Sequence, residues 1–256
     1  MSMHVTRLSV TPIKGLALHH PASIEVDETG AIGDRLFYLV DDDNVLVSIS
    51  RTGGLVGLLA HYDADASVLT IRDGSDVLAQ ARVELGRALE ADFFSFRQVQ
   101  GRLAPGPWDD VFSARAGRSL RLVRADETGH DVEPLTLLGD ASTARLSEAA
   151  GVDDADGRRF RMLIEFDGAT AHAEDDWAGR QVRIGDVIVE VGDAVQRCAG
   201  TTRNPRTGDI DLRTLTFIGS YRGRQESVFG LGFNFGVYAR CVTPGTISVG
   251  DELTLV

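Results

Sequence analysis

The spacing of apolar residues in the first hundred positions predicts β-strands. Residues 36–40 form a continuous apolar run, which is typical of a strand buried on both faces, and the polar residues 41–44 follow as its turn. Residues 68–72 resemble a second strand, after which Asp73-Gly74 offers a hairpin turn. In residues 77–85 apolar or small residues occupy the odd positions, and this alternation predicts a half-exposed strand.

Helices are predicted at only two places. Pro107 at a first-turn position, with Gly117 as the stop, favours one short helix. A second is predicted over residues 140–150, with Asp140 or Ser142 as its N-cap and Gly151 ending it.

The C-terminal half returns to short strands punctuated by glycine. Residues 182–189 and 246–255 each contain a Gly-Asp pair between apolar stretches, and glycine first in a two-residue turn is the type II′ preference. Two further hairpins are therefore predicted. Many short strands of this kind indicate a mainly β fold, a barrel rather than a parallel sheet, with a few short helices.

Composition and charge exclude several classes of function. Of the 256 residues 43% are hydrophobic, enough for a sizeable core. No stretch approaches the roughly 18 apolar residues needed to cross a bilayer, and the N-terminus has no signal-peptide apolar block. These observations predict a cytoplasmic protein. A net charge of −12 disfavours nucleic acid and anionic membranes as partners, so a local cluster of basic residues would be informative.

The most informative segment surrounds Cys198. It is predicted to be a loop, because the pairs Asn204-Pro205 and Thr207-Gly208 both interrupt regular structure. Arg197 and two further arginines nearby would favour thiolate over thiol, and thiolate is the form that binds soft metals and attacks electrophiles. The alternative, that Cys198 is a small buried hydrophobic residue, stays open on this reasoning alone.

Other candidates are weaker. Cys241 lies in a predicted strand and is interpreted as a packing residue, and both thiols are expected to be reduced. His172 would be a proton shuttle near a cofactor or, more simply, a surface histidine. Residues 153–157 lack the ligand spacing of a calcium loop, and no zinc-site spacing occurs in the sequence.

Several motifs together resemble the MOSC family, named after the C-terminal domain of molybdenum-cofactor sulfurase. The main one is Arg-Cys, two variable residues, Thr-Thr and then Asn-Pro-x-Thr-Gly, at residues 197–208. Further blocks resemble the family's Phe-Arg strand, its Glu-Asp-x-Trp and Ile-Gly-Asp patterns, its final strands and the β-barrel domain that precedes MOSC in many members: residues 159–161 with 167–168, 173–177 with 184–186, 235–238 with 244–247 and 249–251, and 12–15 with 33–35. The resemblance implies two β-rich subdomains, an N-terminal barrel-like domain over 1–100 and a MOSC domain over 101–256, with the site in the cleft between them.

Within this family the chain is similar to the amidoxime-reducing components, which implies a bound molybdenum cofactor (Mo-molybdopterin). In that subgroup the matching cysteine binds molybdenum, so Cys198 is the implied metal ligand and catalytic residue. The basic residues at positions that match the grip on the pterin and its phosphate are Lys14, Arg35, Arg161 and Arg197. The sequence departs from the family at Gly15, Val132, Glu133, Leu163 and Gln196, and Glu133 would be unfavourable beside a phosphate.

The leading hypothesis is a molybdenum-dependent oxidoreductase that reduces N-hydroxylated or otherwise N-oxygenated small molecules. Two cysteines cannot hold a four-cysteine cluster, so electrons are expected from a separate donor protein. An alternative is a sulfurtransferase that carries a persulfide on Cys198, without metal or pyridoxal phosphate. A non-catalytic cofactor-binding module is the third possibility, supported by the departures.

Overall fold

A seven-stranded closed β-barrel forms one side of the molecule. The structure is a computed structural model that describes residues 2–256. In the order of their pairing, the barrel strands are β1 (Met3–Leu8), β12 (Ile164–Phe166), β11 (Leu135–Gly139), β15 (Asn234–Thr243), β14 (Val187–Gln196), β13 (Gln181–Ile184) and β17 (Glu252–Leu255). The pair β11–β12 is parallel and the other pairs are antiparallel. This arrangement confirms the predicted mainly β fold with a barrel.

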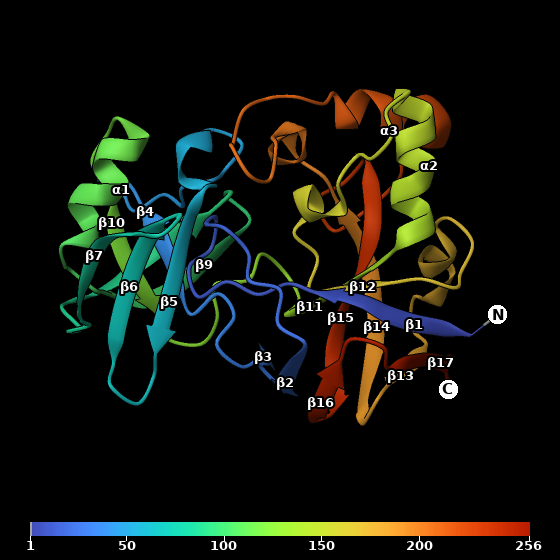
Figure 1. Cartoon of the computed structure of the whole chain (residues 1–256), viewed down its shortest axis with the longest axis horizontal. Helices are drawn as coiled ribbons and strands as arrows, with labels where there is room; N and C mark the ends of the chain where they lie inside the picture. Colours follow the sequence, from blue (N-terminus) through green and yellow to red (C-terminus); the bar gives the residue numbers. More distant parts are fainter. Residues whose placement is uncertain (1) are drawn as a thin grey trace.

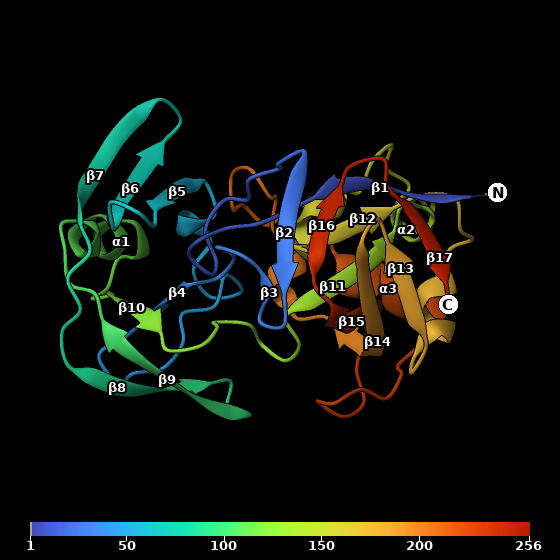
Figure 2. The same cartoon turned by 90° about the horizontal axis from the view of Figure 1, so that it is seen from below.

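The remaining strands form three smaller sheets. They contain β4 (Phe37–Val40), β10 (Arg121–Ala125), β9 (Arg97–Leu103) and β8 (Ala88–Phe93); β5 (Leu58–Asp63), β6 (Val68–Asp73) and β7 (Asp76–Arg82); and β16 (Gly245–Ser248), β2 (Ser23–Asp27) and β3 (Gly30–Ala31). The first two lie on the opposite side of the molecule from the barrel (Figures 1 and 2). All four residues of β4 are buried, as predicted for a continuous apolar run.

The helices cover one side of each half. They are α1 (Trp108–Ala116), α2 (Asp140–Ala150) and α3 (Thr214–Arg222), with 3₁₀ turns η1 (Gly53–Leu55), η2 (Gly157–Phe160), η3 (Ala173–Trp177) and η4 (Ala199–Thr202). Figure 1 shows α2 beside α3 at the barrel end. The two predicted helices are confirmed, and each ends on a glycine with a left-handed backbone. The predicted side-chain cap of α2 is wrong: its N-cap is Gly139, and Ser142 instead donates to Glu174.

Two of the three predicted hairpins are confirmed, at β6–β7 and β13–β14. The third, over residues 246–255, is wrong. There β16 pairs with β2, whereas β17 pairs with β1 and β13 and so closes the barrel. Residues 77–85 form a strand only as far as Arg82, and the side chain of Val77 is exposed rather than packed.

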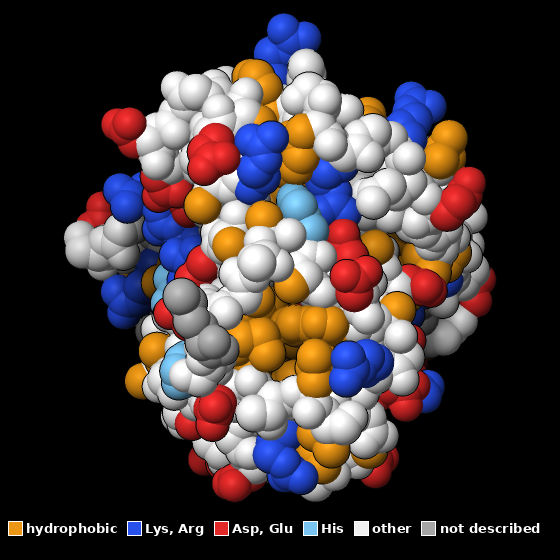
Figure 3. Space-filling model, turned by 90° about the vertical axis from the view of Figure 1, so that its right-hand side faces the viewer, with side chains coloured by type: hydrophobic (Ala, Val, Ile, Leu, Met, Phe, Trp, Pro, Cys, Tyr) orange, Lys and Arg blue, Asp and Glu red, His pale blue; other side chains and the backbone are white. Residues whose placement is uncertain are grey.

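The hydrophobic core is divided between the two sides. One cluster fills the barrel and includes Leu8, Phe166 and Leu253. A second, around Phe37 and Trp108, lies beneath α1. The end of the barrel side (Figure 3) carries Lys and Arg as well as Asp and Glu side chains around a hollow with hydrophobic side chains at its centre.

The boundary predicted at residue 100 remains a prediction. The sheet containing β4 extends to Ala125, and β1 belongs to the barrel although it lies at the N-terminal end of the chain. Each side of the molecule therefore combines strands from distant parts of the sequence.

Candidate functional site

A cavity of about 350 Å³ brings together the five residues that the sequence analysis predicted to bind the cofactor. Its lining includes Lys14, Arg35, Arg161, Arg197 and Cys198, which come from four separate segments of the chain. Loops on the β4 side form one wall, and η2, the end of β14 and η4 form the other. The roles of these residues remain proposals, but their convergence is a property of the fold.

Cys198 follows β14 and is the N-cap residue of η4. Its side chain is exposed, and its Sγ accepts a hydrogen bond from the Gly200 amide at 3.4 Å. A Cβ at Gly200 would lie 2.9 Å from Ile49 on the opposite wall. Glycine is therefore needed where the cysteine turn approaches the N-terminal side of the cavity.

Lys14 lies on the N-terminal wall, where its Nζ is 2.8 Å from a carboxylate oxygen of Asp131. Burial lowers the pKa of Lys14, and the neighbouring Arg35 lowers it further, against the opposing effect of Asp131. Burial by itself would raise the pKa of Asp131, but the charge and hydrogen bond of Lys14 outweigh it and the net pKa is lowered. At 2.8 Å the two groups form an ion pair, so Lys14 presents a cation to the cavity.

Arg35 and Arg161 are neighbours across the two sides of the molecule. The Arg35 guanidinium donates to the backbone carbonyl of Arg161 at 3.1 Å and to Nδ1 of His130 at 3.0 Å. Arg161 donates to the carbonyl of Leu16 at 2.6 Å. Burial, and then the charge of Arg35, lowers the pKa of Arg161 to about 10, so it is still cationic at neutral pH.

Arg197 lines the cavity, but its guanidinium is already engaged. Its Nε donates to the carbonyl of Phe235 at 2.8 Å, and its Nη1 donates to the carbonyl of Phe160 at 3.0 Å. Burial lowers its pKa to about 10. Arg197 thus joins β15 to η2 beneath the cavity, and this leaves Lys14, Arg35 and Arg161 as the better donors to a bound anion.

Positive charge is concentrated in this cavity although the whole chain carries a net charge of −12. Its lining has five cationic side chains and only two carboxylates, those of Asp131 and Glu133. Such an excess favours an anionic ligand.

Several lining residues were missed by the sequence reasoning. Asp131, Arg159 and Tyr238 all face the cavity. His130 is buried behind it and accepts from Arg35.

The position of Arg159 directly before the Phe-Arg motif was the local sequence pattern that could have indicated its role. The Phe-Arg motif itself is not in a strand, because η2 ends at Phe160 and Arg161 has a left-handed backbone with φ 55°.

The family departures divide into two groups. Gly15, Glu133 and Gln196 line the cavity, so their differences from the family face a ligand. Leu163 is buried in the barrel core and Val132 packs against the cluster beneath α2 and α3, so neither changes the cavity lining. Gln196 is held by a hydrogen bond from Ser227 at 2.5 Å.

The remaining candidates lie outside the cavity. Cys241 is half-buried against the barrel core, as predicted for a packing residue. His172 is not a simple surface histidine: its ring packs near Tyr221 and Phe235, and burial, followed by the charges of Arg222 and Arg145, lowers its pKa to about 4. None of the helices formed by residues 2–256 has the length and apolarity to cross a membrane.

The sequence is similar to one domain family and to several characterised proteins. The family model described as "MOSC domain" matches residues 125–254. Human mitochondrial amidoxime-reducing component 1 is 25% identical over 255 residues, with 89% of this chain and 74% of that protein covered. Bovine (Bos taurus) mitochondrial amidoxime reducing component 2 is 31% identical over 285 residues, covering 97% and 82% of the two chains.

Among solved structures, the YUAD protein from Bacillus subtilis aligns with a TM-score of 0.48 and 10% identity, over 99% of this chain and 94% of that chain. The sequence matches are the stronger finding, since the family model covers half of the chain and the bovine relative aligns over nearly all of it. The chain therefore belongs to the MOSC domain family.

Proposed function

We propose that this protein is a molybdenum-cofactor-dependent reductase of N-oxygenated small molecules, such as N-hydroxylated amidines, with Cys198 as the metal ligand. The observation that carries the proposal is the convergence of an exposed cysteine and several cationic side chains on one cavity. The relatives named as amidoxime-reducing components support the reaction class.

The residues present fit a phosphorylated pterin that carries molybdenum. Thiolate sulfur is a soft ligand that suits such a metal, and guanidinium and ammonium groups form charge-assisted hydrogen bonds with phosphate. Cys198 would bind the metal, while Lys14, Arg35 and Arg161 would hold the anionic groups of the cofactor. When bound, the cofactor supplies two-electron redox chemistry, and the protein supplies binding and orientation.

Electrons would come from a separate protein. The chain contains two cysteines, and Cys241 lies in the barrel wall away from the cavity lining, so the four thiolates of an iron–sulfur cluster are not present. The substrate would enter beside the apolar side of the cavity, where Ile49, Phe94 and Phe229 line it.

The test is metal analysis together with fluorescence of the released, oxidised pterin, on protein from a host that makes molybdenum cofactor. We expect near-stoichiometric molybdenum and pterin in the native chain and loss of metal in Cys198→Ser. Cys241→Ser is the matched control and should retain both. Absence of molybdenum and pterin from the native chain would overturn the proposal.

Sulfur transfer is the second candidate, and the exposure of the Cys198 thiol favours it. A persulfide on this cysteine would be accessible to an acceptor without any metal. Intact mass separates the two functions: an adduct of about 32 Da that disappears in Cys198→Ser, on protein free of molybdenum, supports sulfur transfer.

A further inference from the structure

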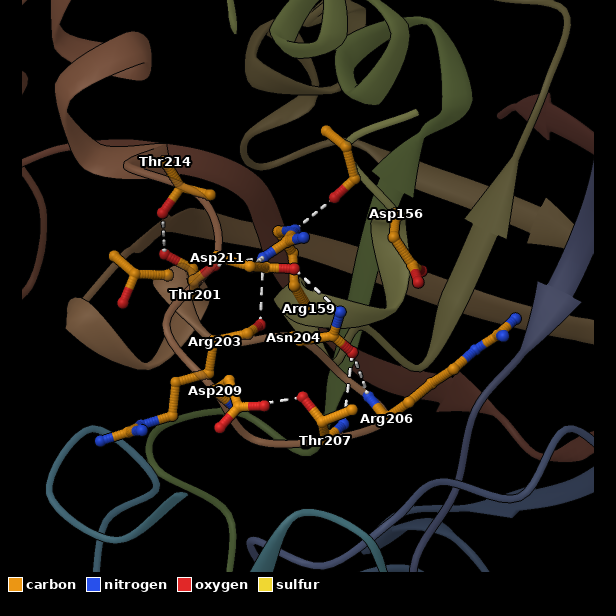
Figure 4. A network of polar contacts seen from close by, with 12 residues as sticks. Asp156, Arg159, Thr201, Arg203, Asn204, Arg206, Thr207, Asp209, Asp211 and Thr214 are labelled. Carbon is orange, nitrogen blue, oxygen red and sulfur yellow. Dashed lines mark hydrogen bonds and ion pairs between the residues drawn. The ribbon is translucent and has the colours of Figure 1, made fainter. Parts of the chain in front are cut away.

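One buried arginine contacts the loop that carries Cys198 at several points. The cysteine loop, residues 197–213, connects β14 to α3 and contains only the short turn η4. A segment of this kind has few backbone ladder bonds of its own, so its conformation depends on contacts to the rest of the protein. Arg159, in η2, supplies several of them (Figure 4).

The guanidinium of Arg159 joins separate points of the chain. Its Nη1 is 3.1 Å from the carbonyl of Thr201, 3.0 Å from that of Arg203 and 3.2 Å from a carboxylate oxygen of Asp211. Its Nε donates to the carbonyl of Ala155, just before η2. The side chain is 4% exposed. A buried charge without acceptors would be strongly unfavourable, so a change of loop conformation that removed these acceptors from Arg159 would destabilise the protein.

The acceptors lie on both sides of a tight turn. Thr201 is within η4, Arg203 directly follows it, and Asp211 lies beyond the turn that Asn204 organises by accepting the Arg206 amide at 2.9 Å. Asn204 also donates to the second carboxylate oxygen of Asp211 at 2.9 Å. Arg159 therefore fixes the beginning and the end of the turn relative to each other.

The same arginine also fixes the loop relative to the basic wall. Arg161, a proposed anion donor, is only two residues further along the chain, and Arg159 itself contributes to the cavity lining. Through Arg159 the backbone that presents Arg161 is tied to the backbone that presents Cys198. A displacement of about 1 Å between such groups can reduce turnover by roughly a hundredfold.

We propose that Arg159 is a positioning residue that sets the position of Cys198 relative to Arg161. For its catalytic consequence the proposal rests on the reductase function above, but the positioning itself can be measured without the cofactor. A planar guanidinium reaches several acceptors at once, whereas lysine offers a single point charge. Lysine is thus expected to replace it only partly.

The experiment compares Arg159→Gln and Arg159→Lys with Arg158→Gln in the full-length chain. Arg158 is the adjacent residue and pairs with Asp156 at 2.5 Å, so it controls for loss of a neighbouring ion pair. Amide hydrogen exchange is followed in the cysteine loop and in α1. In Arg159→Gln we expect exchange in the loop to be about tenfold faster or more, with α1 unchanged, and an intermediate increase in Arg159→Lys.

Two outcomes would overturn the proposal. One is unchanged exchange in the cysteine loop of Arg159→Gln, and the other is an equal increase in loop and α1, which would indicate general destabilisation. If Arg159→Gln does not fold, Asp211→Asn removes the charged acceptor of Arg159 and keeps the side-chain size; because Asp211 also accepts from Asn204, Asn204→Ala is its control. Loop exchange as fast in the native chain as in Asp211→Asn would then count against positioning.

A second measurement separates positioning from the reductase function. If the native chain loads cofactor and reduces an amidoxime, Arg159→Gln should lower kcat by a factor of about 10 to 100, while Arg158→Gln stays close to native. If the native chain shows no reduction at all, the proposed function fails, and the exchange data still decide whether Arg159 positions the loop.

Discussion

Two arginines of the cavity have backbone conformations that residues other than glycine seldom adopt. Arg35 has φ 48° and Arg161 has φ 55°. Each such conformation costs about 1–3 kcal/mol and persists only where surrounding contacts impose it. Both side chains face the cavity, and the Arg35 guanidinium hydrogen-bonds the backbone of Arg161. Strain retained at two linked cationic residues indicates that their direction matters more than local stability.

Lys14 and Asp131 allow the anion-binding role to be tested at a single ion pair. Lys14→Gln removes a cation from the wall and should reduce retained pterin about tenfold or more, because a hydrogen bond to a charged group is worth about 1.5–3 kcal/mol. Asp131→Asn leaves Lys14 without its competing carboxylate, so retention should stay equal or increase. Pterin fluorescence after identical dialysis measures both, and a parallel loss in the two variants would contradict the assignment.

His130 predicts a pH dependence of stability. Burial, and then the charges of Arg35 and Lys14, holds its pKa well below the ordinary value, so the folded protein keeps it neutral while the unfolded chain binds a proton below about pH 6.5. Stability that depends on neutral His130 is therefore present above this pH and is lost as the pH falls. Urea unfolding of the native chain and His130→Gln should show their difference changing by up to about 1.4 kcal/mol per pH unit below 6.5, to the disadvantage of the native chain. A difference that does not vary between pH 7 and 5 would refute this.

At the scale of elements, the cysteine loop packs against η1 through two glycines. A Cβ at Gly208, which has φ +77°, would lie 2.0 Å from the carbonyl oxygen of Gly53. Arg203 spans the same contact by donating to the carbonyls of Gly208 and Ser50, at 2.7 and 3.0 Å. This is the closest approach between the loop and the N-terminal side for which a glycine is required.

Gly208→Ala should therefore destabilise the protein more than a change of backbone preference alone can explain. Gly74→Ala is the matched control, because Gly74 has φ +56° in a hairpin turn and nothing within 4 Å of a Cβ. The control should lose about 1 kcal/mol, and Gly208→Ala at least about twice as much, measured as the free energy of unfolding. Equal losses in the two variants would show that the loop can move away from η1 without cost.

The elements also show where sequence patterns are informative. Strong local signals, such as the continuous apolar run of β4 or the glycine stop of α2, identified their elements correctly. α3 was not predicted, because its sequence contains Thr, Phe, Ile, Gly and Tyr, which favour helix weakly. Its helical state depends on packing, with Ile218 buried beside α2. The wrong hairpin at 246–255 has the same origin, since the partner of β16 lies more than two hundred residues away.

For the candidate site, motifs identified the residues but not their contacts. Cys198 and the basic residues could be selected from the sequence, and they do line one cavity. The engagement of Arg197 with backbone carbonyls and the ion pair of Lys14 depend on which segments the barrel brings together. Long-range closure of this kind leaves no local pattern, and the same reason explains why Arg159 and His130 were missed.

At the scale of the whole molecule, the N-terminal strands are part of the barrel that carries the cysteine. β1 lies between β12 and β17, and its Val5 and Leu8 are buried in the barrel core. β2 pairs with β16, and β3 extends the same sheet. Without these strands, β12 and β17 would each lose a neighbour, and part of the barrel core would be open to water.

This connectivity predicts how a fragment should behave. Residues 101–256 alone should not unfold cooperatively, because the barrel lacks β1 and the apolar contacts of Val5 and Leu8. Adding a peptide of residues 2–31, which contains β1, β2 and β3, should restore a cooperative transition by completing the barrel. The same peptide with Leu8→Asp is the matched control and should fail, because Leu8 is 0% exposed in an apolar core and a charge buried there without a partner is strongly unfavourable. Circular dichroism during heating follows all three samples. A cooperative transition in the fragment alone would show that the N-terminal strands are not needed for the MOSC barrel to fold. Equal rescue by the Leu8→Asp peptide would show that the packing of Leu8 in the core is not what completes the barrel.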